Sequence, residues 1–327
     1  MTNTLAKKIP VTIISGFLGA GKTTLLNQIL GSNTNTRIAV MVNDFGKINI
    51  DSKLIISQTQ TTISLANGCV CCTVEGDLIV QLNALIRDPV AGPEHILIEA
   101  SGISNPSKIA STIRYPQFRD RLYIDSIISI LDADQFGRLE GDMANLASEQ
   151  LDVADIIVIN KIDLVSDAEL AKLKNNWLYP NARVIETSFS KFPLPLLFGL
   201  EQTDSQKNLN DQENMFFDIK NTAPDTSPHS QLFDTWSWSC AAVLDASKLK
   251  QVLMTLPKEI YRAKGVCQLN VFPDNACSVH LVGNRVEVAP SVFWEEKTRK
   301  TELVFIGLSG SIDKKDLNER LNHCVHI

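Results

Sequence analysis

The chain has few cysteines, no excess of basic charge and no long apolar run, and each shortage excludes a class of protein. Seven cysteines among 327 residues are too few for a disulfide-stapled scaffold. The sequence displays neither a secretory leader nor a membrane-spanning run. The net charge of −6 and the lack of a basic stretch argue against a nucleic-acid-binding surface. We therefore expect a cytoplasmic protein in a reducing compartment, with neither a nucleic-acid nor a membrane partner.

The pattern of apolar residues predicts two domains joined by a polar segment. Residues 1–200 alternate short apolar strands with helical patterns, which is typical of an α/β fold in which helices cover both faces of a parallel sheet. Residues 201–231 are rich in Asn, Gln, Asp, Ser and Pro and are predicted to be a linker. Residues 232–327 contain one alternating strand, a helix, three further strand-like runs and a last helix, which predicts a smaller α+β domain.

Residues 16–23 read GFLGAGKT and match the phosphate-binding loop G-x-x-x-x-G-K-[ST] in full. An apolar strand precedes this loop and a helical pattern follows it, which is the context of a P-loop NTPase. Glycines allow backbone N–H groups to surround a phosphate, and the helix N-terminus adds partial positive charge. We expect Lys22 to contact the β- and γ-phosphates and the Thr23 hydroxyl to bind Mg²⁺. The other residues expected around the phosphates are Gly16, Gly19, Ala20, Gly21 and Thr24.

Residues 160–163 read NKID, follow an apolar strand, and match the N-K-x-D box that reads guanine. The Asp163 carboxylate can accept hydrogen bonds from the guanine N1–H and exocyclic amine, which adenine cannot supply. Lys161 is expected along the plane of the base, and Asn160 is expected to tie two loops together. Ser188 follows a further strand-like run, where another base-contacting loop would lie. The alternative for the box is a charged loop that begins a helix.

Two further apolar strands end in acidic residues that could sense the γ-phosphate. Glu99 ends one strand, and a carboxylate there can hold the Mg²⁺ hydration shell or orient water, while the N–H of Gly102 follows the γ-phosphate. Asp44 follows the other strand, where a simple turn former is equally expected. Ligands collect at the carboxyl ends of parallel strands, so we expect both acids at that edge of the sheet.

Residues 68–73 read GCVCCT and place three thiols close together. In a reducing compartment clustered thiols favour metal binding, and an extended chain points Cys69 and Cys71 to the same side. Cys72 can join them only if the backbone turns. Such thiolates suit Zn²⁺ or Co²⁺, and the alternatives are buried small side chains or a redox-active pair.

Three other groups of polar residues have weaker signals. Residues 323–326 read HCVH and could bind a metal or simply end the core. Arg262 and Lys264 could meet a nucleotide or a client protein, or could form a solvated basic turn. His95 and His280 carry no special signal.

Together the motifs resemble those of the CobW-type GTPases, metal chaperones related to the proteins that insert nickel into urease and hydrogenase. The match covers the phosphate loop, NDFG at 43–46, GCVCCT, EASG at 99–102 and the NKID box. Residues 262–265 and 303–307 are similar to the C-terminal domain of that family. The resemblance implies that GTP binds with Mg²⁺, that hydrolysis is slow, and that the cysteine box binds Zn²⁺ or Co²⁺.

Three positions depart from the family pattern. Asp44 stands where the family usually has glutamate, and Lys47 stands where it commonly has an acid. Only His229 marks the segment that many members fill with histidines, so we do not expect a metal-storing linker.

These observations predict a GTP-dependent metallochaperone in which Lys22, Asp44 and Glu99 are catalytic and the three clustered cysteines carry the transferred ion. We expect the γ-phosphate to order the loops around the metal, and hydrolysis to release it beside a client metalloprotein. The chain is expected to be a monomer or a homodimer. Two alternatives stay open: a metal buffer in which the nucleotide is structural, and a P-loop kinase or ATPase.

Overall fold

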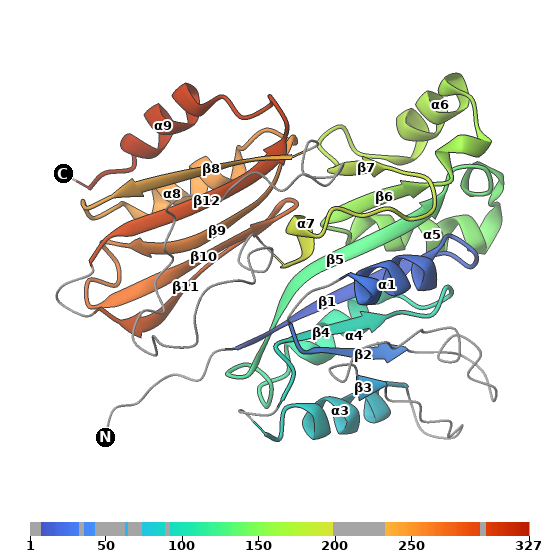
Figure 1. The fold of residues 1–327 in the computed structure, drawn as a ribbon, viewed down its shortest axis with the longest axis horizontal. Helices are drawn as coiled ribbons and strands as arrows, with labels where there is room; N and C mark the ends of the chain where they lie inside the picture. The colour runs from blue at the N-terminus through green and yellow to red at the C-terminus, as the bar shows by residue number, and fades with distance from the viewer. Residues whose placement is uncertain are drawn as a thin grey trace.

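The chain forms two β-sheets, one of seven strands and one of five. The computed structural model describes residues 8–32, 36–42, 63–64, 74–88, 92–198, 233–294 and 299–326. Figure 1 shows the two sheets beside each other, with the larger one built from the first part of the chain and the smaller one from the last.

All strand pairs of the seven-stranded sheet are parallel. Its strands are covered on both faces, and every residue of β4 is buried, which explains the unbroken apolar runs of the sequence. Parallel strands need long crossover connections, which the helices provide. The order across the sheet is β3 (Ile63–Ser64), β2 (Ile38–Val42), β4 (His95–Glu99), β1 (Ile9–Gly16), β5 (Leu122–Asp132), β6 (Ile156–Asn160) and β7 (Val184–Glu186).

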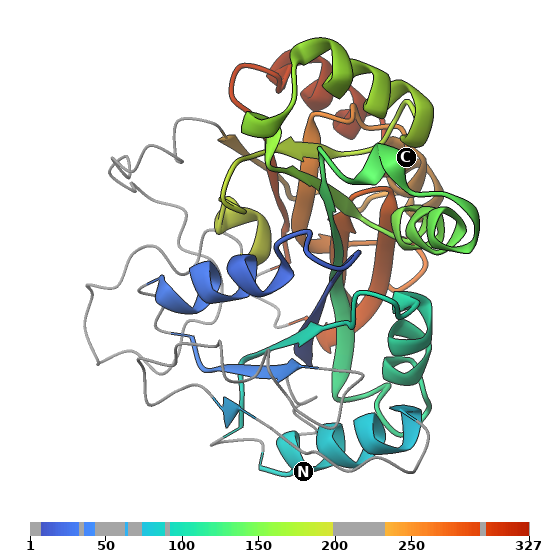
Figure 2. The same ribbon diagram turned by 90° about the vertical axis from the view of Figure 1, so that its right-hand side faces the viewer.

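Helices pack on both faces of this sheet, as Figure 2 shows. One face carries α1 (Lys22–Gly31) and α7 (Pro195–Phe198). The other face carries α3 (Val74–Leu85), α4 (Pro106–Ile113), α5 (Gly141–Asp152) and α6 (Asp167–Trp177). In α3 the stripe predicted from the sequence faces the core, since Leu78, Leu82 and Leu85 are buried. The predicted P-loop type of parallel sheet is therefore confirmed.

The five-stranded sheet is antiparallel and is covered on one face by two helices, α8 (Ala246–Met254) and α9 (Lys314–Asn322). Leu249, Leu253 and Leu317 of these helices pack on its inner side chains. The order is β11 (Arg285–Phe293), β10 (Asn275–Val282), β9 (Ile260–Gln268), β12 (Thr301–Leu308) and β8 (Phe233–Cys240). The predicted smaller α+β unit is confirmed as a fold class.

Two strands of this sheet differ from the prediction made from the sequence. β11 was not predicted: Val286, Glu287 and Val288 alternate as in a strand, but Pro290 interrupts the pattern, which an edge strand tolerates. β9 begins at Ile260, so Arg262 lies in a strand and is 1% exposed. The solvated basic turn and the nucleotide or client contact are therefore wrong for Arg262.

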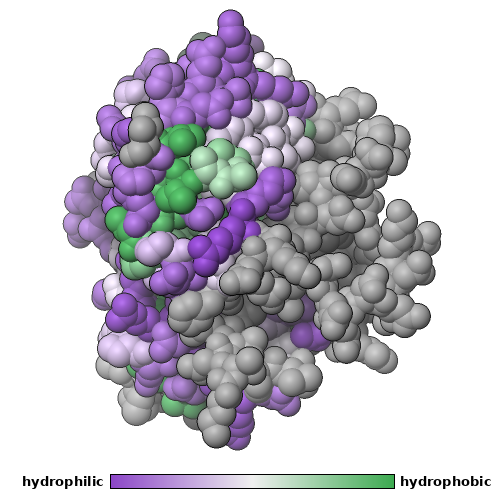
Figure 3. Space-filling model, turned by 90° about the vertical axis from the view of Figure 1, so that its left-hand side faces the viewer, coloured by the Kyte–Doolittle hydropathy of each residue, from purple (hydrophilic) through white to green (hydrophobic). Residues whose placement is uncertain are grey.

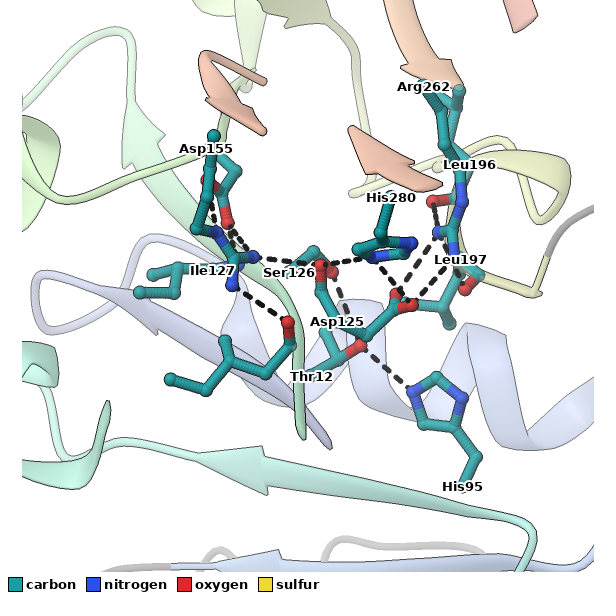
Figure 4. Close-up of polar contacts among 12 residues, drawn as sticks. Thr12, His95, Asp125, Ser126, Ile127, Asp155, Leu196, Leu197, Arg262 and His280 are labelled. Atoms are coloured by element: carbon teal, nitrogen blue, oxygen red, sulfur yellow. Dashed lines mark hydrogen bonds and ion pairs between the residues drawn. The ribbon is translucent and has the colours of Figure 1, made fainter. Parts of the chain in front are cut away.

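Arg262 joins the two sheets through a buried ion pair, shown in Figure 4. Its Nη2 donates to Asp125 Oδ1 of β5 at 2.7 Å, and its Nη1 donates to Asp125 Oδ2 at 3.1 Å. His280 Nε2 lies 3.3 Å from the same carboxylate. A second pair joins Arg285 Nη2 to Asp155 Oδ2 at 2.6 Å. The domains thus share a polar, buried contact, and Tyr261 adds apolar area to it.

The side of the molecule at the left of Figure 1 is mostly hydrophilic where it is described, with one compact apolar area (Figure 3). Within the described ranges, no helix has the length and apolar character needed to cross a membrane.

Candidate nucleotide-binding site

The phosphate loop lies at the carboxyl end of β1, where the strand passes into α1. Two of its glycines are required by geometry. Gly16 has φ 133° and Gly21 has φ 111°, which disfavour other residues. A Cβ on Gly21 would also lie 2.5 Å from both Asn160 Nδ2 and Ser190 Oγ. The loop therefore packs directly on the segments that follow β6 and β7.

The N-terminus of α1 is left open by its own chain. Its N-cap is Gly21, and no side chain among the described residues caps it. By contrast α4, α6, α8 and α9 are capped by the side chains of Asn105, Ser166, Asp245 and Asp313. The first N–H groups of α1 and their partial positive charge are thus available to an anion.

Thr23 and Glu99, 76 residues apart in sequence, meet beside this helix end. Thr23 Oγ1 donates a hydrogen bond to Glu99 Oε1 at 2.9 Å, and Glu99 is 2% exposed. Lys22 is 8% exposed, and its Nζ donates to the Phe17 carbonyl at 3.1 Å. These residues line a cleft of about 320 Å³, together with Leu18, Gly19, Gly21, Thr24, Val42 and residues 100–102. The structure therefore brings most of the residues predicted for the phosphates and for Mg²⁺ to one cleft, while Gly16 and Ala20 of the same loop do not line it.

Asn160 ties the phosphate loop to the segment after β7. Its Nδ2 donates to the Ala20 carbonyl at 2.8 Å and lies 2.9 Å from Ser190 Oγ. Its Oδ1 accepts from the Ser190 N–H at 2.8 Å. Asn160 is 3% exposed, so these bonds are shielded from water. The tie between two loops that the sequence predicted is present in the geometry.

Lys161 and Asp163 follow on the same loop with different surroundings. Lys161 adopts a left-handed backbone with φ 62°, and its Nζ binds Asp132 Oδ2 at 2.6 Å. Asp163 lies in the short 3₁₀ helix η2 (Ile162–Leu164) and is exposed. Its carboxylate makes no hydrogen bond or ion pair within the described part of the chain. Ser188 is half-buried on the neighbouring loop, whose Thr187 carbonyl accepts from the Ile162 N–H at 3.3 Å.

Comparison with known proteins identifies the family. Residues 10–185 match the model of the CobW/HypB/UreG nucleotide-binding domain, and residues 233–325 match the cobalamin synthesis protein cobW C-terminal domain. The chain belongs to the CobW/HypB/UreG family. The predicted resemblance to CobW-type GTPases is thereby confirmed.

Full-length relatives are similar over almost the whole chain. The chain is 26% identical to zinc-regulated GTPase metalloprotein activator 1 of Dictyostelium discoideum, covering 98% of this chain and 80% of that protein. It is 27% identical to the zinc chaperone CobW of Sinorhizobium sp, covering 92% and 93%. A crystal structure of Zn(II)-bound YjiA GTPase from E. coli is 22% identical with a TM-score of 0.43, covering 98% of this chain and 100% of that one.

Two residues that support the site of this CobW-type chain were missed from the sequence. Asp132 is the last residue of β5, and besides Lys161 it accepts the N–H of Asp134 at 3.0 Å. A carboxylate directly after an apolar strand was the available signal. Gln150 of α5 is 1% exposed and donates to the carbonyls of Gly102 at 3.2 Å and Ser104 at 3.0 Å, which fixes the turn after β4. A glutamine on a helix gave no signal of that contact.

Several predicted residues lie outside the described residues: Asp44 and the three cysteines, Cys69, Cys71 and Cys72. Within the described part of the chain, no group of three His, Cys, Asp or Glu residues could hold a metal ion. At the C-terminus Cys324 is fully buried, and burial raises the pKa of its thiol. His323 and His326 are exposed, and His323 Nδ1 is 2.7 Å from the Glu319 carbonyl. This arrangement favours the core role for Cys324 over the metal site.

Proposed function

We propose that this chain is a GTP-dependent metallochaperone. The observation that carries the proposal is the position of Asn160, which bridges the phosphate loop at Ala20 and the base loop at Ser190. Asn160 begins the NKID box, so the exposed carboxylate of Asp163 follows three residues after the side chain that is bonded to the phosphate loop. A nucleotide with its phosphates on the helix end then meets Asp163 with its base.

Guanine is the base that suits this arrangement. A carboxylate only accepts hydrogen bonds, so Asp163 matches the adjacent N1–H and amine donors of guanine. Adenine presents an acceptor at N1 and would leave the carboxylate unpaired. The Nζ of Lys161 is held by Asp132, and we assign the aliphatic stem of Lys161 to the plane of the base.

The phosphate end fits Mg²⁺ by its donor set. Thr23 and Glu99 offer hard oxygen ligands, which Mg²⁺ prefers, and we assign Thr23 to the ion and Glu99 to its bound water. When bound, the ion neutralises charge on the β- and γ-phosphate oxygens. Lys22 adds positive charge at the same phosphates, and the Gly102 N–H follows the γ-phosphate. We assign Asp44 to water positioning, and expect slow turnover because no arginine finger is apparent.

The metal is cargo in this proposal, held by Cys69, Cys71 and Cys72 as Zn²⁺ or Co²⁺ and passed to a client metalloprotein. Support comes from the thiolate chemistry of the cluster and from the relatives, which are named zinc chaperone and zinc-regulated GTPase metalloprotein activator. The γ-phosphate closes the loops around the ion and hydrolysis opens them. The domains keep the boundaries 1–200, 201–231 and 232–327, and the protein acts in the cytoplasm as a monomer or homodimer.

The proposal is tested by replacing the base reader. Asp163→Ala removes two hydrogen bonds to a charged acceptor and should weaken GTP binding roughly 100-fold or more, with ATP binding unchanged. Asp167→Ala, an exposed acid four residues on, is the matched control and should bind GTP normally. A wild-type protein that prefers ATP, and is indifferent to Asp163→Ala, would instead be a P-loop kinase or ATPase.

A titration with Zn²⁺ and Co²⁺ under reducing conditions tests the cargo. Co²⁺ thiolate absorption should tighten with Mg²⁺-GTP and vanish in Cys69→Ala/Cys71→Ala. Metal binding that ignores GTP, in a protein that does not hydrolyse it, would identify the metal buffer instead.

A further inference from the structure

Phe189 is the most exposed large apolar side chain among the described residues, at 74%. It lies on the loop after β7, between Ser188 and the Ser190 that bonds to Asn160. A single exposed apolar residue is ordinary on a protein surface and indicates nothing alone. What sets Phe189 apart is its backbone.

The described part of the chain has three non-glycine residues with positive φ, and all three lie in the two base loops. They are Lys161 at 62°, Phe189 at 59° and Ser190 at 55°. An aromatic residue in this region is a genuine outlier, because its Cβ crowds the backbone. Such strain persists where the surroundings fix it, and it gathers at ligand sites.

Buried anchors on both sides of Phe189 fix this conformation. Before it, Thr187 is 7% exposed and its N–H donates to the Ile159 carbonyl at 2.8 Å. After it, Ser190 is fully buried and its Oγ donates to the Gly21 carbonyl at 3.1 Å. Because Thr187 is bonded to β6 and Ser190 to the phosphate loop, the ring between them is held out from the core. The same loop is joined to the NKID loop, since the Ile162 N–H donates to the Thr187 carbonyl at 3.3 Å.

We propose that the Phe189 ring packs against the purine of the bound nucleotide and supplies affinity that does not depend on which purine is bound. This inference rests on the proposed function, since it requires a guanine nucleotide at the Asp163 loop. Every purine has an apolar π face, so stacking on an aromatic side chain adds affinity without reading donors and acceptors. Asp163 then chooses guanine, while Phe189 holds the base.

The test compares GTP with ITP, which lacks the exocyclic amine, by equilibrium binding to the full chain with Mg²⁺. Phe189→Ala should weaken both nucleotides by the same factor, about tenfold. Asp163→Ala should weaken GTP more than ITP, because ITP offers the carboxylate one donor fewer. Phe189→Trp should bind both within about threefold of wild type, with its fluorescence changed by the base. Met254→Ala, which removes another exposed side chain on α8, should change neither affinity.

Phe189→Asn separates the contribution of the aromatic ring to binding from the contribution of the left-handed backbone. Asparagine tolerates the left-handed region, so the nucleotide-free variant should melt at or above the wild-type temperature and still bind both nucleotides about tenfold more weakly. Wild-type affinity in Phe189→Asn and Phe189→Ala would overturn the inference and leave the proposed function intact. Failure of the wild type to bind any guanine nucleotide would overturn both.

Discussion

The two ends of the seven-stranded sheet carry similar residues in opposite circumstances. At the carboxyl ends, Glu99, Asp132 and Asn160 are the last residues of β4, β5 and β6, and Glu99 lines the open cleft. At the amino ends, His95 begins β4 and Asp155 directly precedes β6. There Asp155 pairs with Arg285 of the five-stranded sheet, whereas His95 lies beside Thr12 of β1 (Figure 4).

A charged residue at a strand end therefore does not by itself indicate function. Asp125 is fully buried, and Arg262 and His280 satisfy it from the second sheet. Although burial raises it, Arg262 first and then His280 hold the pKa of Asp125 well below its usual range. Asp163 is exposed, with a carboxylate that the described part of the chain leaves unbonded. A charge that the fold satisfies holds the structure together, whereas one left open remains available to a ligand.

The largest effect is expected from breaking the buried ion pair. Arg262→Met leaves Asp125 buried without its main partner and should lower the free energy of unfolding by about 3–5 kcal/mol. Asp125→Leu/Arg262→Met should cost less than the single change, because no charge is stranded. Urea denaturation measures both, and Arg138→Met, in an exposed pair, should cost under about 1 kcal/mol. If folded Arg262→Met also loses GTP affinity, the two ends of the sheet are coupled, and the charges at the amino ends are not purely structural.

The second-largest effect is expected to be a pH dependence of the free energy of unfolding, which arises at the amino ends of the strands. Burial, with contributions from Arg262 and Lys264 and opposed by Asp125, lowers the pKa of His95 from 6.5 to about 4. The unfolded chain binds this proton from about pH 6.5 downward and the folded chain only near pH 4, so stability falls as pH falls through that window.

Lowering the pH from 7 to 5 should therefore cost roughly 2 kcal/mol through His95. His95→Gln should remove that part of the slope while keeping a polar contact to Thr12, which lies 2.9 Å from His95 Nε2. Asp125 does not contribute here, because its stabilisation is lost only below its usual pKa. Burial raises the pKa of Asp155, although the charge of Arg285 opposes this shift. Protonation of Asp155 therefore changes the stability in the opposite sense to protonation of His95. Because wild type and His95→Gln both contain Asp155, this contribution is common to the two proteins. Equal slopes in urea midpoints for the two proteins would contradict the assignment.

The smallest effect is expected at the carboxyl ends. Asp132→Asn removes the charge that holds Lys161 but keeps an acceptor for the Asp134 N–H. GTP should bind about fivefold more weakly, with the free energy of unfolding changed by under about 0.5 kcal/mol. Asp134→Asn, at a half-buried neighbour that binds Arg138, serves as the control for titration calorimetry. A large loss of stability in Asp132→Asn would instead show that Asp132 is a structural charge, as Asp125 is.

The parts foreseen correctly are those fixed by neighbours in sequence. The fold class and the family are confirmed, and most of the residues predicted for the phosphates and for Mg²⁺ line one cleft. Their chemical roles stay predictions, as do the cysteine site, Asp44 and the domain boundaries. Arg262 was misjudged because a strand with alternating charges resembles a solvated turn until its covering surface is known. β11 was missed because Pro290 argues against a strand until the place of that strand at the edge of the sheet is known.

The sequence by itself determined the phosphate loop, the NKID box and the alternation of strands and helices. These depend on contacts within a few residues, where glycine conformation, strand burial and helix termini act directly. Only the tertiary structure decided which charges are structural. Arg262 and Asp125 are 137 residues apart, and nothing near either one identifies its partner. It also decided that Thr187 and Ser190 are buried anchors and that Phe189 between them is not, because burial depends on what the rest of the chain packs against.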